Sequence, residues 1–168
     1  AAAAGAAPAL PQGVGDRLGR YELLGHLLDE DATPLLVLIN SKSGGQQGRA
    51  VLEGFKSLLH PFQVWDVTTT APAPVLEFFA GLPRLRVLVA GGDGTAGWIL
   101  QEVERAFGAA GRRAPPVAVL PLGTGNDLAR VLRWGPGYTG GDLNDVLRAV
   151  SAAHPAELDR WDVVATAA

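Results

Sequence analysis

Residues 85–98, LRVLVAGGDGTAGW, decide the fold. The apolar run 85–90 predicts a buried strand, the glycine-rich segment 91–95 predicts a turn, and a helical pattern follows from Thr95. Glycine lets a ligand approach the backbone, and the free N–H groups of a helix's first turn point toward that ligand. The stretch therefore predicts a strand–turn–helix unit that binds an anion.

The glycine spacing in this turn also fits the dinucleotide fingerprint G-x-G-x-x-G, at Gly92, Gly94 and Gly97. The next predicted strand, however, ends in Pro121 rather than in an acid that would hold a ribose. Asp93 would repel a bare pyrophosphate but not a phosphate accompanied by Mg²⁺, because the cation attracts both groups. The turn favours a metal–nucleotide complex over a dinucleotide, and a glycine turn with a solvated aspartate is the alternative.

The composition indicates one packed domain. The 168 residues are 48% hydrophobic and 18% charged, with a net charge of -3. This charge gives no basic surface for nucleic acid, and no apolar run approaches the roughly 18 residues of a membrane span. Without Cys, disulfides and thiolate metal sites are excluded, and the absence of Met suggests a piece of a longer protein. A secretory signal pattern is not present, and a cytoplasmic protein is expected.

Predicted strands and helices alternate along the chain. Residues 1–33 are low in complexity and are expected to be largely flexible, whereas residues 34–168 are expected to form the ordered domain. Alternation of this kind predicts an α/β fold, a parallel sheet with helices on both faces. The expected strands are residues 35–39, 62–68, 85–90, 117–120 and 158–164, and the expected helices are residues 47–59, 72–80, 95–107, 127–133 and a last helix that begins after Asp142.

Polar and glycine-rich segments follow each of the first four predicted strands. Because parallel strands end at the same edge of a sheet, residues 40–45, Thr68, residues 91–95 and residues 123–127 are expected to meet in one crevice. Such a crevice suits phosphoryl transfer, which needs charge neutralisation and alignment of the attacking hydroxyl. Asp93 could hold Mg²⁺ or accept the hydroxyl proton, and the sequence leaves both roles open.

The other polar residues of these segments each allow an ordinary interpretation. Lys42 lacks the Walker spacing and, taken alone, is more often a solvated loop lysine. Thr68 and Thr124 could donate hydroxyls to phosphate or ribose, but threonine is also common at strand ends. Asn126 and Asp127 begin a predicted helix, so they either cap it or face the acceptor as a polar pair.

Three segments of the chain carry specific motifs. They are residues 91–95 within VLVAGGDGTAGWIL, residues 117–135, VAVLPLGTGNDLARVLRWG, and residues 39–45, INSKSGG. Together these segments resemble the catalytic domain of eukaryotic diacylglycerol kinases. The likeness covers residues 34–164. GGDGT alone is shared with NAD kinases, phosphofructokinases and sphingosine and ceramide kinases, whereas GTGND with its continuation is far more specific. The resemblance implies the Rossmann-like nucleotide-binding domain of the NAD kinase and diacylglycerol kinase type.

The resemblance also implies a reaction and its residues. ATP with Mg²⁺ would phosphorylate the free hydroxyl of 1,2-diacylglycerol to give phosphatidic acid. Asp93 would be the catalytic residue and the metal ligand. The residues implied for ATP are Asn40, Ser41, Lys42, Ser43, Gly44, Thr68, Gly91, Gly92, Gly94, Thr95 and Thr124, and those implied for the lipid substrate are Gly123, Gly125, Asn126 and Asp127.

The chain departs from the family pattern in two ways. Ser41 stands where the family usually has Pro, and the family's β-rich second catalytic subdomain is expected in the parent protein rather than within residues 34–168. The chain is thus expected to be the nucleotide-binding half, acting on diacylglycerol at a membrane surface after peripheral recruitment. The alternatives are a soluble-metabolite kinase of the NAD kinase type and a non-catalytic nucleotide-binding fragment. The aromatic loop 134–138 is expected to pack locally, with membrane contact as the alternative.

Overall fold

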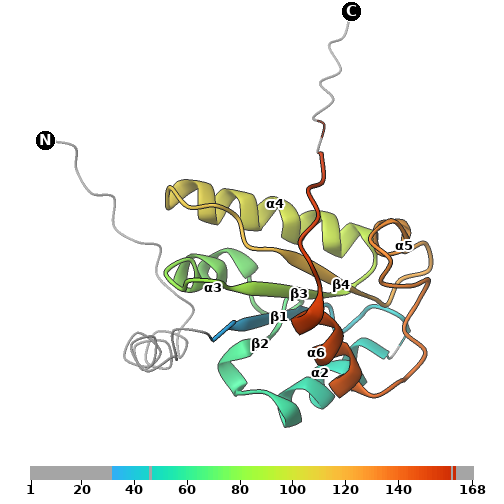
Figure 1. Cartoon of the computed structure of the whole chain (residues 1–168). Helices are drawn as coiled ribbons and strands as arrows, with labels where there is room; N and C mark the ends of the chain where they lie inside the picture. Colours follow the sequence, from blue (N-terminus) through green and yellow to red (C-terminus); the bar gives the residue numbers. More distant parts are fainter. Residues whose placement is uncertain (1–31, 46, 160, 162–168) are drawn as a thin grey trace, which may run out of the picture.

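The computed structural model describes residues 32–45, 47–159 and 161, so the expected flexible segment 1–33 lies almost wholly outside the described residues. Strands and helices alternate as expected (Figure 1). The elements are β1 Leu35–Ile39, α2 Gln47–Leu58, a 3-10 helix η2 Pro61–Gln63, β2 Val64–Asp66, α3 Pro72–Phe79, β3 Arg86–Gly91, α4 Asp93–Ala109, β4 Val117–Pro121, α5 Asp127–Val131 and α6 Leu143–Ala152.

The four strands form one parallel sheet in the order β2-β1-β3-β4. Ile39 of β1 is in register with Ala90 of β3, and Gly91 of β3 with Pro121 of β4. All four strands therefore end at the same edge, which confirms the predicted sheet and brings together the loops that follow the strands.

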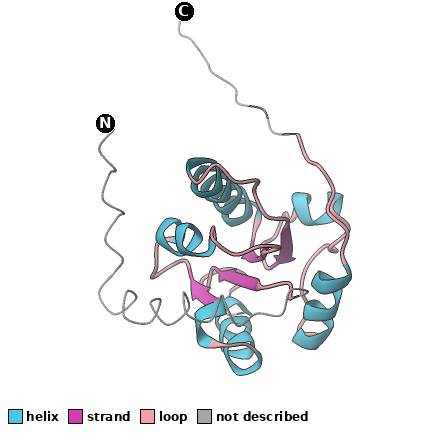
Figure 2. Cartoon of the chain, turned by 60° about the vertical axis from the view of Figure 1, so that its left-hand side comes forward, coloured by secondary structure: helices cyan, strands magenta, loops and turns pink. Residues whose placement is uncertain are grey.

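Helices cover both faces of the sheet (Figure 2). Alternate residues of each strand point to opposite faces, so β1 supplies Leu36 and Leu38 to one core and Val37 and Ile39 to the other. The first core packs against α3 and α4, and the second against α2 and α6. Every one of these strand residues is fully buried, which is why the strands are continuous apolar runs.

The second strand is shorter than predicted. His60 caps η2. Its ring Nδ1 accepts a hydrogen bond from the backbone N–H of Phe62, and its backbone N–H donates to Oε1 of Gln63. The chain therefore makes one helical turn at residues 61–63 before β2 begins at Val64. An apolar pattern alone does not reveal this reciprocal cap.

The strand predicted at 158–164 is wrong for the part of it that the structure describes. Leu158, Asp159 and Trp161 are not in a strand, and the rest lies outside the described residues. Leu158 is 47% exposed and Trp161 is 87% exposed, and the described part of this segment continues the chain beyond α6 (Figure 1). An apolar run forms a strand only where a neighbouring backbone accepts its hydrogen bonds, and these residues have none in the described sheet.

The aromatic loop 134–138 packs on the domain, as expected. Trp134 and Tyr138 are half-buried against the core that α2 and α6 cover. They line a cavity of about 310 Å³ between the end of β4 and α6, and the backbone N–H of Tyr138 donates to the carbonyl of Pro121. Among the described residues, none of the helices has the length and apolar character needed to cross a bilayer.

Candidate functional site

The loops that follow β1 and β3 are joined by side chains. The amide Nδ2 of Asn40 donates to the hydroxyl of Thr95 at 2.9 Å, and its Oδ1 accepts from the backbone N–H of Lys42 at 3.0 Å. One side chain thus holds the first glycine loop in shape and attaches it to the start of α4. The predicted convergence of residues 40–45 with residues 91–95 is confirmed.

The loops that follow β1 and β2 are joined by Asp66, a residue that sequence reasoning missed. Its Oδ1 accepts the backbone N–H of Thr68 at 2.9 Å and that of Ser41 at 3.4 Å. Beside it, the hydroxyls of Ser41 and Thr68 lie 3.1 Å apart. Burial raises the pKa of Asp66, whereas hydrogen bonds from Ser41 and Thr68 lower it. The hydrogen bonds outweigh burial, so the pKa lies below the ordinary 3.8. Asp66 lies inside the predicted strand 62–68, two residues before its polar end, and a charged residue in that position was the signal that could have found it.

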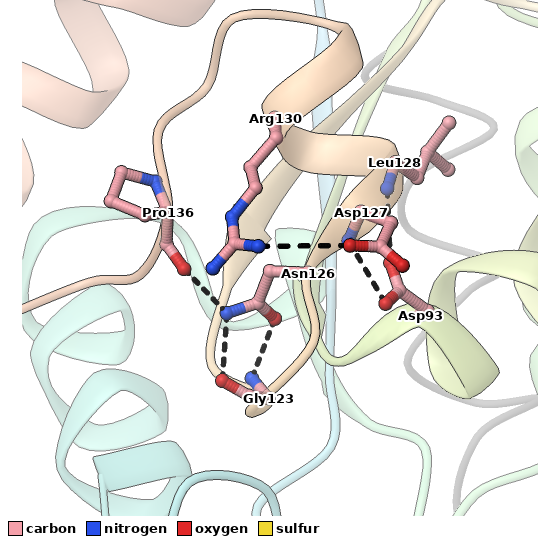
Figure 3. Close-up of polar contacts among 7 residues, drawn as sticks. All are labelled: Asp93, Gly123, Asn126, Asp127, Leu128, Arg130 and Pro136. Atoms are coloured by element: carbon pink, nitrogen blue, oxygen red, sulfur yellow. Dashed lines mark hydrogen bonds and ion pairs between the residues drawn. The ribbon is translucent and has the colours of Figure 1, made fainter.

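The loops that follow β3 and β4 are joined by Asp93 (Figure 3). Its Oδ2 accepts the backbone N–H of Asp127 at 3.0 Å, and its Oδ1 accepts that of Leu128 at 3.1 Å. These are first-turn N–H groups of α5, which have no partner inside the helix. Asp93 therefore caps a helix that begins 34 residues later and holds the GGDGT and GTGND segments together.

Asn126 braces the fourth loop from inside. It is 2% exposed, and its Oδ1 accepts the N–H of Gly123 while its Nδ2 donates to the carbonyls of Gly123 and Pro136 (Figure 3). It occupies the N-cap position of α5 with φ 54°, but its side chain makes no capping bond. The polar atoms of its side chain already bond to Gly123 and Pro136. The role of Asn126 in substrate binding stays a prediction, and it would act through the shape of the loop.

Two glycine contacts show why the loops can lie so close together. A Cβ on Gly123 would lie 2.6 Å from Cα of Gly92, and a Cβ on Gly48 would lie 2.4 Å from the carbonyl oxygen of Asn40. Both distances are far below van der Waals contact, so packing within the protein already requires these glycines. Gly48, at the start of α2, is a second residue that sequence reasoning missed.

Gly94 differs from these glycines. It lies in the first turn of α4, it is exposed, and a Cβ built on it would meet nothing within 4 Å. Packing within the described protein therefore gives no reason for glycine here. Open space beside the N-terminus of a 17-residue helix, whose dipole and free N–H groups favour negative charge, fits the approach of a phosphate.

The remaining predicted residues lie on the same rim. Lys42 and Thr124 are exposed, and Ser43 accepts the N–H of Gly48 with its carbonyl. Asp127 is exposed and lies 3.7 Å from the guanidinium of Arg130 (Figure 3). Gly44 has φ +64°, Gly91 packs on the side chain of Thr95, and a Cβ on Gly125 would meet Oδ2 of Asp93 at 3.0 Å.

The rim does not form a protein-only metal cage. Across residues 32–45, 47–159 and 161, no group of three or more His, Cys, Asp or Glu side chains could hold a metal ion. Each oxygen of Asp93 accepts one backbone N–H and keeps a further lone pair. One carboxylate with spare acceptor capacity fits Mg²⁺ that arrives with phosphate oxygens, which is the usual mode for this ion.

The family model for the diacylglycerol kinase catalytic domain matches residues 34–163. The chain belongs to this family. The match contains β1 to α6 and every rim residue described above, which confirms the resemblance seen in GGDGT and GTGND.

Individual relatives agree with this assignment. The chain is 50% identical over 133 residues to "Probable diacylglycerol kinase 3" of Caenorhabditis elegans, covering 79% of this chain and 16% of the relative. It is 50% identical over 143 residues to "Diacylglycerol kinase theta" of Homo sapiens, covering 85% of this chain and 15% of the relative. It is 46% identical over 130 residues to "Diacylglycerol kinase zeta" of Homo sapiens, covering 77% of this chain and 14% of the relative. The chain thus spans about one sixth of the length of these relatives. No solved structure matches the chain.

Proposed function

We propose that this chain is the ATP-binding part of a diacylglycerol kinase, which transfers the γ-phosphate of ATP to the free hydroxyl of 1,2-diacylglycerol and yields phosphatidic acid. The observation that carries the proposal is the bridge from Asp93 to the backbone of Asp127 and Leu128. It holds the phosphate-type turn of α4 against the GTGND loop, so a nucleotide and its acceptor could meet over one carboxylate. The family match and the printed names of the relatives support the lipid substrate.

Within this proposal, backbone N–H groups bind the triphosphate. The start of α4 and the loop 40–45 present N–H groups and open space at Gly94. Lys42 is exposed on the same loop and can add one positive charge. Mg²⁺ carried by the nucleotide would supply charge neutralisation, and Asp93 is the residue placed to hold it.

Asp93 is also the candidate to orient the attacking hydroxyl. Its carboxylate is fixed by two backbone bonds, so it needs little rearrangement to meet a hydroxyl placed over the GTGND loop. Ionised carboxylates are acceptors only, and a lipid hydroxyl is a donor.

Three parts of the proposal concern the parent protein. Diacylglycerol would be met at a membrane surface, the parent would be recruited to that surface peripherally from the cytoplasm, and a second catalytic subdomain would complete the lipid site. The domain itself is proposed to begin at residue 34.

The test offers diacylglycerol and NAD together to the full-length protein that carries this domain, with labelled ATP. Labelled phosphatidic acid is expected, and labelled NADP would refute the lipid substrate. Asp93→Asn should lower the rate at least about 100-fold, a typical effect for a group that aligns or deprotonates a nucleophile. Glu53→Gln, an acid-to-amide change on the exposed surface of α2, is the matched control and should leave the rate unchanged.

A further inference from the structure

Asp66 is an acidic residue that the proposed reaction does not use. It ends β2, the strand beside β1, and β1 leads into the first glycine loop. In the dinucleotide-binding α/β fold, an acid about 20 residues after the glycine-rich turn accepts a hydrogen bond from the ribose. Asp66 stands at that place, whereas the strand that follows the GGDGT turn ends in Pro121.

The carboxylate of Asp66 is turned toward the rim. Its Oδ1 is bonded to backbone N–H groups of Ser41 and Thr68, which belong to the two loops above β1 and β2. Both backbone bonds use the same oxygen, and the side chains of Ser41 and Thr68 also hydrogen-bond to this carboxylate. The paired hydroxyls of Ser41 and Thr68 lie beside it and add two more groups that can bond to a sugar hydroxyl.

The chemistry of these groups favours a sugar over a phosphate. An ionised carboxylate only accepts hydrogen bonds and repels an anion, so it suits ribose hydroxyls. The phosphate-type features, Gly94 and the start of α4, lie on the far side of β1 from Asp66. Two strand spacings separate β2 from β3, about 10 Å, over which a triphosphate chain can extend.

We infer that Asp66 binds the ribose of the nucleotide through its hydroxyls, with the phosphates running across β1 toward Gly94 and Asp93. This inference rests on the proposed function, since it takes a nucleotide as the ligand. It gives the nucleotide a direction on the rim: the nucleoside lies over β2 and the terminal phosphate lies nearest the GTGND loop. It also makes Asp66 a residue that distinguishes ribose from sugars without hydroxyls.

The experiment compares ATP with 2′,3′-dideoxyATP by calorimetry, in Mg²⁺, using the 168-residue chain. For the wild type, ATP should bind about tenfold more tightly, a ratio equal to about 1.4 kcal/mol. In Asp66→Ala the two nucleotides should bind equally, because the group that reads the hydroxyls is gone. Asp66→Asn keeps an acceptor oxygen for the loops and should lower the ratio to about threefold or less. Glu53→Gln should keep the wild-type ratio.

A purely structural role for Asp66 would weaken both nucleotides alike and leave the ratio at its wild-type value. That result, in Asp66→Asn or in Asp66→Ala, would overturn the inference. Should Asp66→Ala fail to fold, the ratio in Asp66→Asn decides. Equal binding of the two nucleotides by the wild type would refute the ribose contact alone, whereas no binding of either would remove the proposed nucleotide site as well.

Discussion

The side-chain amide of Asn40 donates a hydrogen bond to the hydroxyl of Thr95 across 55 positions of the sequence. This bond joins the loops that follow β1 and β3, the two central strands of the sheet. With Ser41 and Thr68 on one side and Asp93 on the other, it completes a chain of side-chain bonds along the rim. The shape of the rim is therefore held by the protein itself before any ligand binds.

The Asn40–Thr95 bond should be measurable by a double-mutant cycle. Asn40→Ala and Thr95→Val each remove one partner, and the coupling in the free energy of unfolding should be about 0.5–1.5 kcal/mol. Urea unfolding of the four proteins gives this value. Pairing Asn40→Ala with Thr139→Val, an exposed threonine, should give additive effects. A coupling of zero for Asn40 and Thr95 would show that the two loops are not joined by this bond.

Asn126 should be among the most costly polar residues to replace. Asn126→Ala leaves the N–H of Gly123 and the carbonyls of Gly123 and Pro136 without this partner and puts alanine at φ 54°. A loss of about 3 kcal/mol or more in the free energy of unfolding is expected, since each buried unpaired group costs about 1–3 kcal/mol. Asn126→Gly relieves the backbone and should lose less than Asn126→Ala. Equal losses would mean that the backbone conformation contributes nothing.

Two glycines on the rim should respond to alanine in opposite directions. Gly123→Ala places a Cβ against the backbone of Gly92 and should lower the free energy of unfolding by about 1–3 kcal/mol. Gly94→Ala meets no protein atom and should raise it by up to about 1 kcal/mol, because alanine is the better helix former. The same Gly94→Ala should weaken ATP binding at least about tenfold by filling the space a phosphate needs. A more stable Gly94→Ala protein with unchanged ATP affinity would place the phosphates elsewhere.

Stability in acid should depend on Asp66. Its folded-state pKa is lowered by hydrogen bonds from Ser41 and Thr68 despite burial. A lowered pKa stabilises the folded state at pH values above the ordinary 3.8, and this contribution is lost as the pH falls through the folded-state pKa. The free energy of unfolding of Asp66→Asn should therefore decline less steeply below pH 3.8 than that of the wild type. Urea unfolding at pH 5, 4 and 3 tests this, and parallel declines would contradict it.

The elements of the sheet could be predicted because their signals are local. Continuous apolar runs such as residues 35–39 are buried on both faces, and the polar loops after the strands share one edge for a geometric reason. The apolar run at 158–164 misled, because local pattern does not say whether a neighbouring backbone is present. The second strand is shorter than predicted because His60 caps the helical turn before it. This cap depends on a hydrogen bond between the backbone of His60 and the side chain of Gln63, which the apolar pattern does not reveal.

The position of the candidate site could be predicted from the sequence, but the hydrogen bonds that join its loops could not. The charge of Asp93 between glycines marks it as a candidate in the sequence, but its bonds to the backbone of α5 depend on a loop 34 residues away. Asp66 resembles an ordinary acid at a strand end until Ser41 and Thr68 are placed beside it. The sequence allows Asn126 either to cap a helix or to face the acceptor in a polar pair with Asp127, whereas its bond to Pro136 requires the later loop to fold back. Contacts between distant loops are tertiary facts that one sequence does not contain.

The most direct test of the central claim is a calorimetric titration of the 168-residue chain with ATP, with and without Mg²⁺. We predict saturable binding at one site that Mg²⁺ strengthens, and loss of most of the Mg²⁺ effect in Asp93→Asn. The reason is that Asp93 is the carboxylate at the centre of the joined loops. No saturable binding by the folded chain, or a Mg²⁺ effect that Asp93→Asn leaves intact, would contradict the claim that this rim binds the triphosphate.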